Sequence, residues 1–443
     1  MLVYKFGGTS VGSVTNMNHV KDIISDNKQK VVVLSAMSGT TNTLVEISNH
    51  IKTNDLILAK ASIDVLNEKY NAVVFELLQD NQLRQEASQY VTETFNTLRT
   101  LVEQEYSQLL YNRIVANGEL LSTYLFTSFL KQEDYNAVLI SALDFMRLDR
   151  NNEPDKFYIK QNIHRELERL PNADIYITQG FISLDADGDI TNLERGGSDY
   201  TATILGAALN AEEVQIWTDI DGFHNNDPRY VNETQALSNL SYDEAAELAY
   251  FGAKILHPQT VMPVRELSIP LRLKNTMAPD AHGTLINNQI HGEGIKAIAA
   301  KDDITAIKIK SVRMLLAHGF LKKVFEIFEI YETPIDMITT SEIAVSLTID
   351  NTQNLEAIVT ELQKFAEVEV EDYMSIVCLV GNQIIYHPDT PELFQILQDV
   401  NVRMIAYGGS NNNISLLVNT SDKLETLQKL QRYVFDSDTV PTL

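Results

Sequence analysis

A lysine, two glycines and two hydroxyl residues follow one another near the N-terminus, directly after a short apolar strand pattern. The segment is Lys5-Phe6-Gly7-Gly8-Thr9-Ser10, and a stretch with helical spacing follows it. Glycines leave backbone N–H groups uncrowded, and the start of a helix carries partial positive charge, so the segment can cradle a phosphate. A P-loop requires a lysine after its last glycine, whereas Ser13 follows Gly12 here. The alternative is an ordinary strand-to-helix turn with a solvated lysine.

A second glycine pair, Gly196-Gly197, lies between Arg195 and Ser198-Asp199 and precedes another helical run. Its backbone amides can bind a second anion, and Arg195 can donate two hydrogen bonds to a carboxylate. Asp199 can hold a lysine by an ion pair, or it can cap the helix that it precedes. Together the two motifs predict a site for two anions, one of them a phosphate.

The motifs occur in an order that resembles the aspartate kinases of the amino-acid kinase family. The resemblance extends over essentially the whole chain. It rests on five separated segments, which are Lys5-Phe6-Gly7-Gly8-Thr9-Ser10, Leu34-Ser35-Ala36, Asn117-Gly118-Glu119-Leu120, Arg195-Gly196-Gly197-Ser198-Asp199-Tyr200 and Phe251-Gly252-Ala253-Lys254. Agreement of all five in order is far more specific than any one of them.

The resemblance implies that ATP, carried with Mg²⁺, phosphorylates the side-chain carboxylate of L-aspartate to give 4-phospho-L-aspartate and ADP, the first step toward lysine, threonine and methionine. The acceptor is already ionised at neutral pH, since an unperturbed Asp titrates near about 4. No general base is therefore needed. The enzyme must instead align two negative groups and stabilise the charge that spreads over the transferring phosphoryl group.

Roles for individual residues follow from the same resemblance. Lys5 would stabilise the transferring phosphate and Asp199 would orient Lys5. The residues implied to contact ATP are Lys5, Gly7, Gly8, Thr9, Ser10, Thr218, Asp219, His224, Arg229, Lys254 and Ile255. The residues implied to bind aspartate are Ser35, Thr41, Glu119, Arg195 and Ser198, with Arg195 against a carboxylate and Glu119 near the α-ammonium. No residue is assigned as a metal ligand.

Simpler structural roles remain open for several of these side chains. Glu119 could interact with a helix dipole at the surface, and Thr41 could cap a helix. Arg229 and Lys254 could be solvated, the default for long cations. His224 also departs from the family, because many members have a tyrosine there.

The composition is that of a globular enzyme with two or three domains: 443 residues, 44% hydrophobic and 21% charged. The net charge of −25 argues against binding to nucleic acids or anionic membranes. A nucleotide must then be held by local cations and by Mg²⁺ on its phosphates. The single cysteine, Cys378, lies in an apolar run and is expected to be a buried strand thiol. No membrane span or leader is expected, so the predicted location is cytoplasmic.

Apolar strand patterns alternate with helical stretches through the first two thirds of the chain. The strand patterns are residues 31–34, 137–140, 174–177, 213–217 and 269–273. This alternation predicts an α/β fold with a mainly parallel central sheet flanked by helices and with ligands beyond the carboxyl ends of the strands. Residues 55–131 predict a helical subdomain. A polar stretch at 277–296 predicts the end of a catalytic domain, residues 1–290.

An internal repeat follows, in which Met404 lies 67 residues beyond Met337 in matching surroundings. The repeat predicts two α+β ferredoxin-like units that resemble paired ACT domains, residues 297–365 and 366–443, with exchange of strands between them left open. ACT domains bind amino acids as regulators. The chain most resembles the lysine-sensitive branch, in which the effector binds at the first ACT units of two subunits, and this implies a homodimer or homotetramer.

The positions that correspond to the effector site are Met314, Ala317, Gly319, Phe320, Asp336, Thr340, Ser341 and Glu342. Two positions depart from the family pattern, because Ala317 stands where serine is frequent and Pro334 offers no amide donor. The alternative is that these residues are ordinary turn and strand-end polar groups.

Three functions remain compatible with the sequence. The first is a single-function aspartate kinase, since no dehydrogenase module follows Leu443. The second is another amino-acid kinase, acting on glutamate, acetylglutamate or a nucleotide, and the paired C-terminal units weigh against it. The third is an amino-acid sensor without catalysis, and the intact Lys5, Asp199 and Lys254 argue against that.

Overall fold

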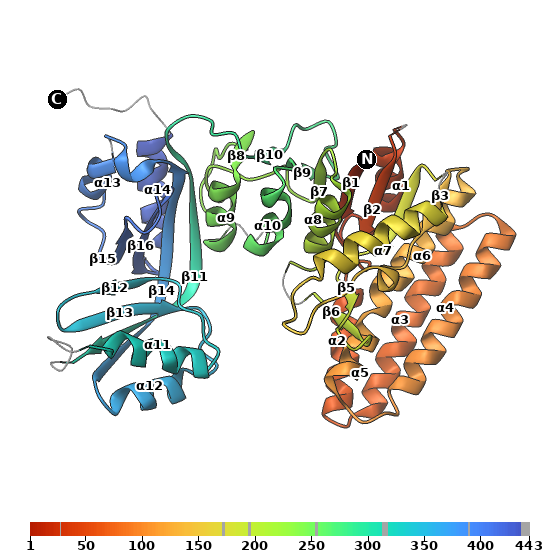
Figure 1. Ribbon diagram of the computed structural model, residues 1–443, viewed down its shortest axis with the longest axis horizontal. Helices are drawn as coiled ribbons and strands as arrows, with labels where there is room; N and C mark the ends of the chain where they lie inside the picture. Colours follow the sequence, from red (N-terminus) through yellow and green to blue (C-terminus); the bar gives the residue numbers. More distant parts are fainter. Residues whose placement is uncertain are drawn as a thin grey trace. The chain divides into compact units, whose positions relative to one another are not determined.

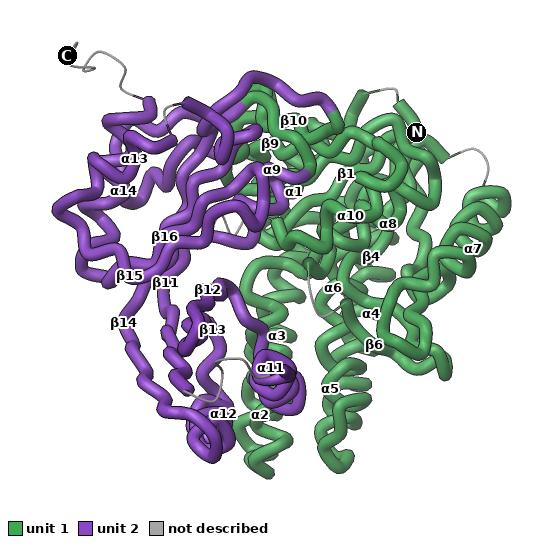
Figure 2. Tube along the Cα trace, turned by 60° about the vertical axis from the view of Figure 1, so that its left-hand side comes forward, with its two compact units in different colours: residues 1–223, 238–242, 256–288 green, residues 224–237, 243–255, 289–443 purple. Residues whose placement is uncertain are grey.

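The computed structural model describes residues 1–26, 28–170, 173–193, 196–252, 256–311, 318–388 and 390–435. Two compact units can be distinguished (Figure 2), the first formed by residues 1–223, 238–242 and 256–288 and the second by residues 224–237, 243–255 and 289–443. The second unit therefore includes two segments from within the predicted catalytic range. Among the described residues, no helix is both long and apolar enough to span a bilayer.

Within the described part of the first unit, eight strands form one sheet in the order β3-β4-β2-β1-β7-β9-β10-β8. The strands are β1 (Leu2–Phe6), β2 (Lys30–Leu34), β3 (Ala137–Leu139), β4 (Ile175–Gln179), β7 (Val214–Thr218), β8 (Asn239–Ser241), β9 (Leu271–Asn275) and β10 (Thr284–Asn287). From β3 to β9 every pairing is parallel, and β10 runs antiparallel to β9. The predicted mainly parallel α/β sheet is confirmed, and the carboxyl ends of its parallel strands share one edge.

Helices connect the strands of this sheet, and a hairpin of β5 (Ile182–Leu184) and β6 (Ile190–Asn192) follows β4. The connecting helices include α1 (Val14–Ile24), η1 (Ala142–Asp144), α7 (Lys156–Arg169), α8 (Gly197–Leu209) and α10 (Pro258–Glu266). The helix α1 begins after Ser13, whose hydroxyl accepts the N–H of Asn16 at 3.2 Å. The glycine loop of residues 7–12 therefore leads directly into a capped helix N-terminus.

A helical subdomain lies in the same unit (Figure 1). Its helices are α2 (Thr40–Lys52), α3 (Leu56–Leu77), α4 (Asn81–Leu101), α5 (Gln108–Val115) and α6 (Asn117–Gln132). Side chains of Asp55, Asp80 and Ser107 cap the N-termini of α3, α4 and α5. Apolar residues at helical spacing, such as Ile63 and Leu66 on α3, are buried in its core. The prediction of helices over residues 55–131 is confirmed.

Among the described residues of the second unit, six strands form an antiparallel sheet in the order β12-β13-β11-β14-β16-β15. The strands are β11 (Gly294–Lys310), β12 (Ile338–Thr340), β13 (Ala344–Ile349), β14 (Glu367–Asn382), β15 (Val402–Tyr407) and β16 (Asn413–Asn419). The helices are α9 (Tyr242–Tyr250), α11 (Phe320–Ile330), α12 (Leu355–Gln363), η3 (Ile384–Tyr386), α13 (Thr390–Ile396) and α14 (Lys423–Val434). Elements recur in the same order in the two halves, as the 67-residue repeat predicts.

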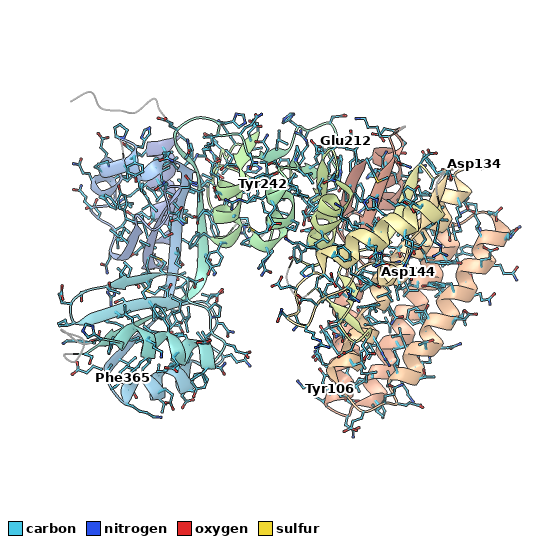
Figure 3. The ribbon with its side chains drawn as sticks, in the orientation of Figure 1. Tyr106, Asp134, Asp144, Glu212, Tyr242 and Phe365 are labelled. Atoms are coloured by element: carbon cyan, nitrogen blue, oxygen red, sulfur yellow. The ribbon has the colours of Figure 1, made fainter. Side chains whose placement is uncertain are left out.

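The strands β11 and β14 contribute to two separate hydrophobic cores. One core contains Ile307 of β11 with α11, α12 and β13. In this core Phe320 packs edge-on against Phe365, with the ring centroids 5.8 Å apart. Figure 3 labels Phe365 in the first ACT-like half. The other core contains Ile298 of β11 with Val377 of β14 and residues of β16 and α14. Because β11 passes from the second core into the first, both ACT-like halves share one continuous sheet.

Candidate active site

Lys5 and Asp199 form an ion pair at the carboxyl edge of the parallel sheet. Lys5 lies on β1 beside Val33 of β2 and Ile216 of β7, and its Nζ is 2.6 Å from Oδ1 of Asp199. Asp199 lies in the first turn of α8, whose N-cap is Gly196 with a φ of 71°. Since glycine occupies the cap, the alternative that Asp199 caps the helix is wrong. Its carboxylate instead fixes the lysine ammonium.

The loop after β1 is held in a narrow space against the loop after β2. A Cβ atom added to Gly8 would lie 2.8 Å from the carbonyl oxygen of Ala36, so only glycine fits there. The hydroxyls of Ser10 and Thr276 are 2.7 Å apart and buried, and Thr9 is exposed. The loop thus has a fixed course beside Lys5, with its second hydroxyl already engaged.

Glu119 is buried near the N-terminus of α6, only 3% exposed. Its Oε1 accepts the backbone N–H of Ala36 at 3.1 Å, and its Oε2 is buried with no hydrogen-bond partner among the described residues. Burial raises the pKa of Glu119 to about 7. The alternative of a surface dipole partner is therefore wrong, and the free oxygen can accept a hydrogen bond from a cationic ligand.

A hydrogen bond between two serines connects the carboxyl end of β2 to the first turn of α8. The hydroxyl of Ser35 donates to Oγ of Ser198 at 2.9 Å. Gly180 follows β4, and a Cβ atom added there would lie 2.3 Å from Cβ of Ser198. The first turn of α8, which carries both Ser198 and Asp199, therefore lies directly against the end of β4.

Replacing Gly180 with alanine should impair both folding and catalysis. The added methyl group must push the first turn of α8 away, which moves Ser198 and Asp199; overpacking of this kind typically costs about 1–3 kcal/mol. Urea denaturation measures the loss of stability, and steady-state kinetics measures the fall in kcat. Gly409→Ala is the matched control, because that glycine has open space and no positive φ. Unchanged kinetics in Gly180→Ala would contradict the argument.

Thr41 is the second residue of α2, whose N-cap is Gly39 with a φ of 80°. The alternative that Thr41 caps a helix is therefore wrong, and its half-buried side chain remains a predicted aspartate contact. Thr218 ends β7, next to β1 in the sheet, and its hydroxyl donates to Asp219 at 3.1 Å. Thr218 and Asp219 thus belong to the same sheet edge as Lys5.

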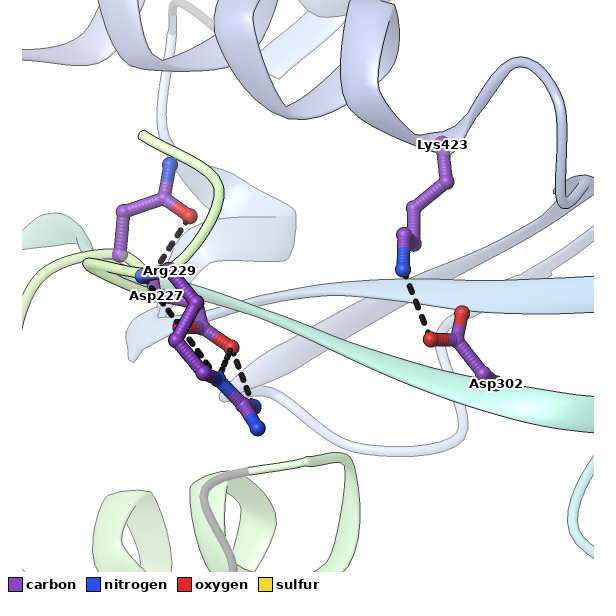
Figure 4. A network of polar contacts seen from close by, with 5 residues as sticks. Asp227, Arg229, Asp302 and Lys423 are labelled. Carbon is purple, nitrogen blue, oxygen red and sulfur yellow. Dashed lines mark hydrogen bonds and ion pairs between the residues drawn. The ribbon is translucent and has the colours of Figure 1, made fainter. Parts of the chain in front are cut away.

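His224 and Arg229 belong to the second unit. The side chain of Arg229 is 68% exposed, and its guanidinium contacts Asp227 at 2.6 Å. Figure 4 shows this ion pair together with a second one, between Lys423 and Asp302 at 2.7 Å. Nδ1 of His224 lies 3.0 Å from the hydroxyl of Thr234. Arg229 is thus exposed but not a free cation, and its contact with ATP stays a prediction.

The loop that carries Arg229 is anchored on the second unit. Asn226 donates to Gln431 of α14 at 3.0 Å, and the carbonyl oxygen of Asn225 accepts the N–H of Ile298. Val231 is buried in the same core as α14. The sequence analysis missed this anchoring, because Asn226 and Gln431 are 205 residues apart.

The predicted effector residues that the structure describes lie on the first ACT-like half. Gly319, with a φ of 84°, is the N-cap of α11, and Phe320 is buried behind it. The side chain of Asp336 is only 2% exposed. The remaining three are exposed at the end of β12 and in the turn before β13, and they are Thr340, Ser341 and Glu342. Five predicted site residues lie outside the described residues, and they are Arg195, Lys254, Ile255, Met314 and Ala317.

Comparisons with known proteins agree with this architecture. Residues 1–275 match the model of the amino acid kinase family, and residues 377–433 match that of an ACT domain. The chain is 35% identical to lysine-sensitive aspartokinase 3 of Escherichia coli (strain K12), over 98% of this chain and 99% of the relative.

Two crystal structures of the E. coli enzyme are also similar. Aspartokinase III in complex with aspartate and ADP, in its R-state, superposes with a TM-score of 0.86 at 35% identity and covers 98% of this chain and 100% of its own. The complex with lysine and aspartate, in its T-state, gives a TM-score of 0.81 at 34% identity and covers 98% and 99%.

Proposed function

Because this chain belongs to the amino acid kinase family and is an aspartate kinase, an ATP-dependent phosphotransferase, we propose that Lys5 and Asp199 act at the transferring phosphoryl group. The observation that supports this is the 2.6 Å ion pair at the edge of the sheet, beside the glycine loop. Asp199 holds the ammonium of Lys5 in place, so that its charge opposes the negative charge that develops on the phosphoryl oxygens. The main-chain amides of Gly7, Gly8, Thr9 and Ser10 and the exposed hydroxyl of Thr9 complete the phosphate site.

Aspartate is bound through both of its α-substituents in this proposal. The free Oε2 of Glu119 accepts a hydrogen bond from the α-ammonium, and Arg195 pairs with the α-carboxylate. Ser35, Thr41 and Ser198 make smaller polar contacts. The β-carboxylate then remains free to attack the phosphoryl group without a general base, because it is already ionised.

The nucleotide is proposed to bring Mg²⁺ with it. ADP occupies the similar E. coli structure, which supports ATP as the co-substrate here. Mg²⁺ usually binds through one or two carboxylates and substrate phosphates, and Asp219 offers a suitable exposed carboxylate at the end of β7. The ion would neutralise phosphate charge. Thr218, His224, Arg229, Lys254 and Ile255 are the further proposed nucleotide contacts.

Aspartate should be the acceptor that releases ADP. A coupled assay of ADP release with aspartate, with glutamate and without an acceptor separates the three functions that the sequence left open. Release with aspartate alone supports the proposal. Faster release with glutamate would point to another amino-acid kinase, and no release with any acceptor would point to a sensor.

Lysine is the proposed effector, and it would bind at the first ACT-like half. The E. coli relative is named for its sensitivity to lysine and has been crystallised with lysine in its T-state. The buried carboxylate of Asp336 suits an ammonium group. A homodimer or homotetramer is proposed as the assembly. A cytoplasmic location is also proposed and fits a chain whose one cysteine is buried on a strand.

Added lysine is expected to lower aspartate-dependent ADP release. The physical reason is that a ligand which prefers one conformation shifts the protein toward it, here the less active one. Titration of lysine into the coupled assay measures the effect, and threonine serves as the parallel control. Activity that stays constant across a wide range of lysine concentrations would reject this part of the proposal.

A further inference from the structure

Three of the proposed aspartate-binding residues meet at the peptide group that joins Ser35 to Ala36. The hydroxyl of Ser35 donates to Ser198 at 2.9 Å. The N–H of Ala36 donates to Oε1 of Glu119 at 3.1 Å, and Oε2 of that carboxylate has no hydrogen-bond partner among the described residues. The orientation of this one peptide group therefore affects where the hydroxyl of Ser35 and the carboxylate of Glu119 lie.

A fourth side chain, that of Ser122 on α6, holds the other end of the same peptide group. Its fully buried hydroxyl donates to the carbonyl oxygen of Ser35 at 2.7 Å. Glu119 and Ser122 are three residues apart, so they lie on one face of α6, about one turn from each other. Because a peptide group is planar, a C=O that is fixed on Ser122 also fixes the direction of the N–H that Glu119 accepts.

The hydroxyl of a serine within a helix commonly donates to a carbonyl oxygen of its own helix. Ser122 has such an acceptor as well, because the carbonyl oxygen of Glu119 lies 3.2 Å from its Oγ. The contact with Ser35 is shorter, at the usual distance of about 2.7 Å between two oxygens in a hydrogen bond. Ser122 therefore donates outside its helix, to the segment that carries Ser35.

The first turns of α6 are held in place by other contacts. The hydroxyl of Thr123 donates to the carbonyl oxygen of Glu119 at 2.8 Å and accepts the side-chain amide of Gln179 on β4 at 2.8 Å. Gln179 in turn accepts the N–H of Ala142 at 2.7 Å. Removal of the Ser122 hydroxyl should therefore leave the helix in position and release only the peptide group.

We propose that Ser122 is a positioning residue for aspartate binding, which acts by fixing the peptide group 35–36 against Glu119. The inference rests on the proposed function, in which Oε2 of Glu119 accepts a hydrogen bond from the α-ammonium. Without the bond from Ser122 the peptide group can turn, and its N–H moves away from Oε1. The carboxylate then takes up further orientations, and fewer of them present Oε2 to the substrate. Aspartate binding weakens, whereas the ion pair of Lys5 with Asp199 keeps both partners.

The test compares the full-length Ser122→Ala variant with the unmodified protein in the coupled assay. The KM for aspartate should rise roughly 3- to 10-fold, the equivalent of one lost hydrogen bond, while kcat and the KM for ATP stay within about twofold. A general loss of structure would not give that split. An unchanged KM for aspartate, or equal rises in the two KM values, would overturn the inference.

Ser128→Ala is the matched control. Ser128 lies on the same helix and is also buried, but its hydroxyl donates to the carbonyl oxygen of Tyr124 within α6, at 3.0 Å. The control variant should keep kcat and both KM values. If its KM for aspartate rises as much as that of Ser122→Ala, the effect belongs to the helix and the proposed contact with Ser35 is wrong.

A pH profile gives a second readout of positioning. Burial raises the pKa of Glu119 to about 7, and the bond from the N–H of Ala36 opposes this rise. A weaker bond should raise the pKa further, so the acid limb of kcat/KM for aspartate should move to higher pH in Ser122→Ala. Tyr70 on α3 is a titratable neighbour of Glu119, and burial raises the pKa of its hydroxyl, so Tyr70 stays neutral across this limb. An acid limb that does not move would contradict the proposal.

The variant Glu119→Gln distinguishes failure of this inference from failure of the proposed function. If Glu119→Gln weakens aspartate binding and Ser122→Ala does not, the inference is wrong and the proposed aspartate site stands. If Glu119→Gln leaves the KM for aspartate unchanged, the proposed contact of Glu119 with the α-ammonium is wrong, and the inference fails with it.

Discussion

Replacing Lys5 with alanine is expected to lower kcat by roughly 10³-fold and to leave the protein folded. The Lys5 ammonium is held 2.6 Å from Asp199 on a central strand, so alanine removes the positive charge that this ion pair positions. The substrates still bind through other groups, and the loss is therefore expected in kcat more than in KM. The coupled assay measures kcat, and circular dichroism with thermal unfolding checks the fold.

Lys21→Ala is the control for this variant. Lys21 lies on α1 of the same unit and forms an ion pair with Glu133 at 3.0 Å, outside the site. Its removal should leave kcat unchanged. If Lys5 and Asp199 act as a unit, a variant in which both are replaced by alanine should lose no more activity than Lys5→Ala alone. A kcat close to normal in Lys5→Ala would refute the mechanism.

Replacing Glu119 with glutamine is expected to lower kcat/KM for aspartate on the order of 10²-fold, the usual effect of removing one partner of a buried ion pair. Glutamine keeps the shape of the side chain and can still accept the N–H of Ala36. It cannot neutralise the α-ammonium. The KM for ATP should not change. The ion pair of Glu133 with Lys21 lies outside the site and offers the control Glu133→Gln. In this variant kcat/KM for aspartate and the KM for ATP should both stay normal.

The role of Glu119 also predicts a pH dependence of the unmodified enzyme, which the same variant should lack. Burial raises the pKa of Glu119 from an ordinary 4.5 to about 7, so the free enzyme loses the required carboxylate as the pH falls through 7. kcat/KM for aspartate should then fall about tenfold per pH unit below that value.

Stability should respond in the opposite direction. The folded protein holds a proton on Glu119 that the unfolded chain releases near 4.5. The contribution of Glu119 to the free energy of unfolding is complete below pH 4.5, and it is lost as the pH rises through about 7. Both dependences should be absent in Glu119→Gln. A pH profile of kcat/KM that is the same in both proteins would contradict the assignment.

Local sequence patterns predicted most of the fold because they report on burial along a continuous segment. The apolar run at residues 31–34 corresponds to β2, which begins one residue earlier at Lys30. What the patterns could not predict are pairings between distant segments. Nothing near Asn226 indicates that its amide bonds to Gln431, and so the loop at 224–237 was predicted to be part of the catalytic domain.

The same distinction applies to the site. The predicted ion pair of Lys5 with Asp199 forms, whereas the catalytic role of both residues stays a prediction. The neighbours that shape the site were not predicted, because they act through main-chain atoms or through the lack of a side chain. The N–H of Ala36 on Glu119 and the close approach of Gly180 to Ser198 are the two clearest cases.

The continuous strands β11 and β14 restrict how the regulatory half can change during evolution. An insertion of one residue inside either strand would reverse which side chains face inward beyond that point, unless a β-bulge absorbs it, as the register shifts of the β11–β14 pairing do between residues 301 and 306. Changes in length are therefore accommodated in turns, around helices or at such bulges. The duplicated halves can diverge in the side chains they present, while the two shared strands join them into one sheet.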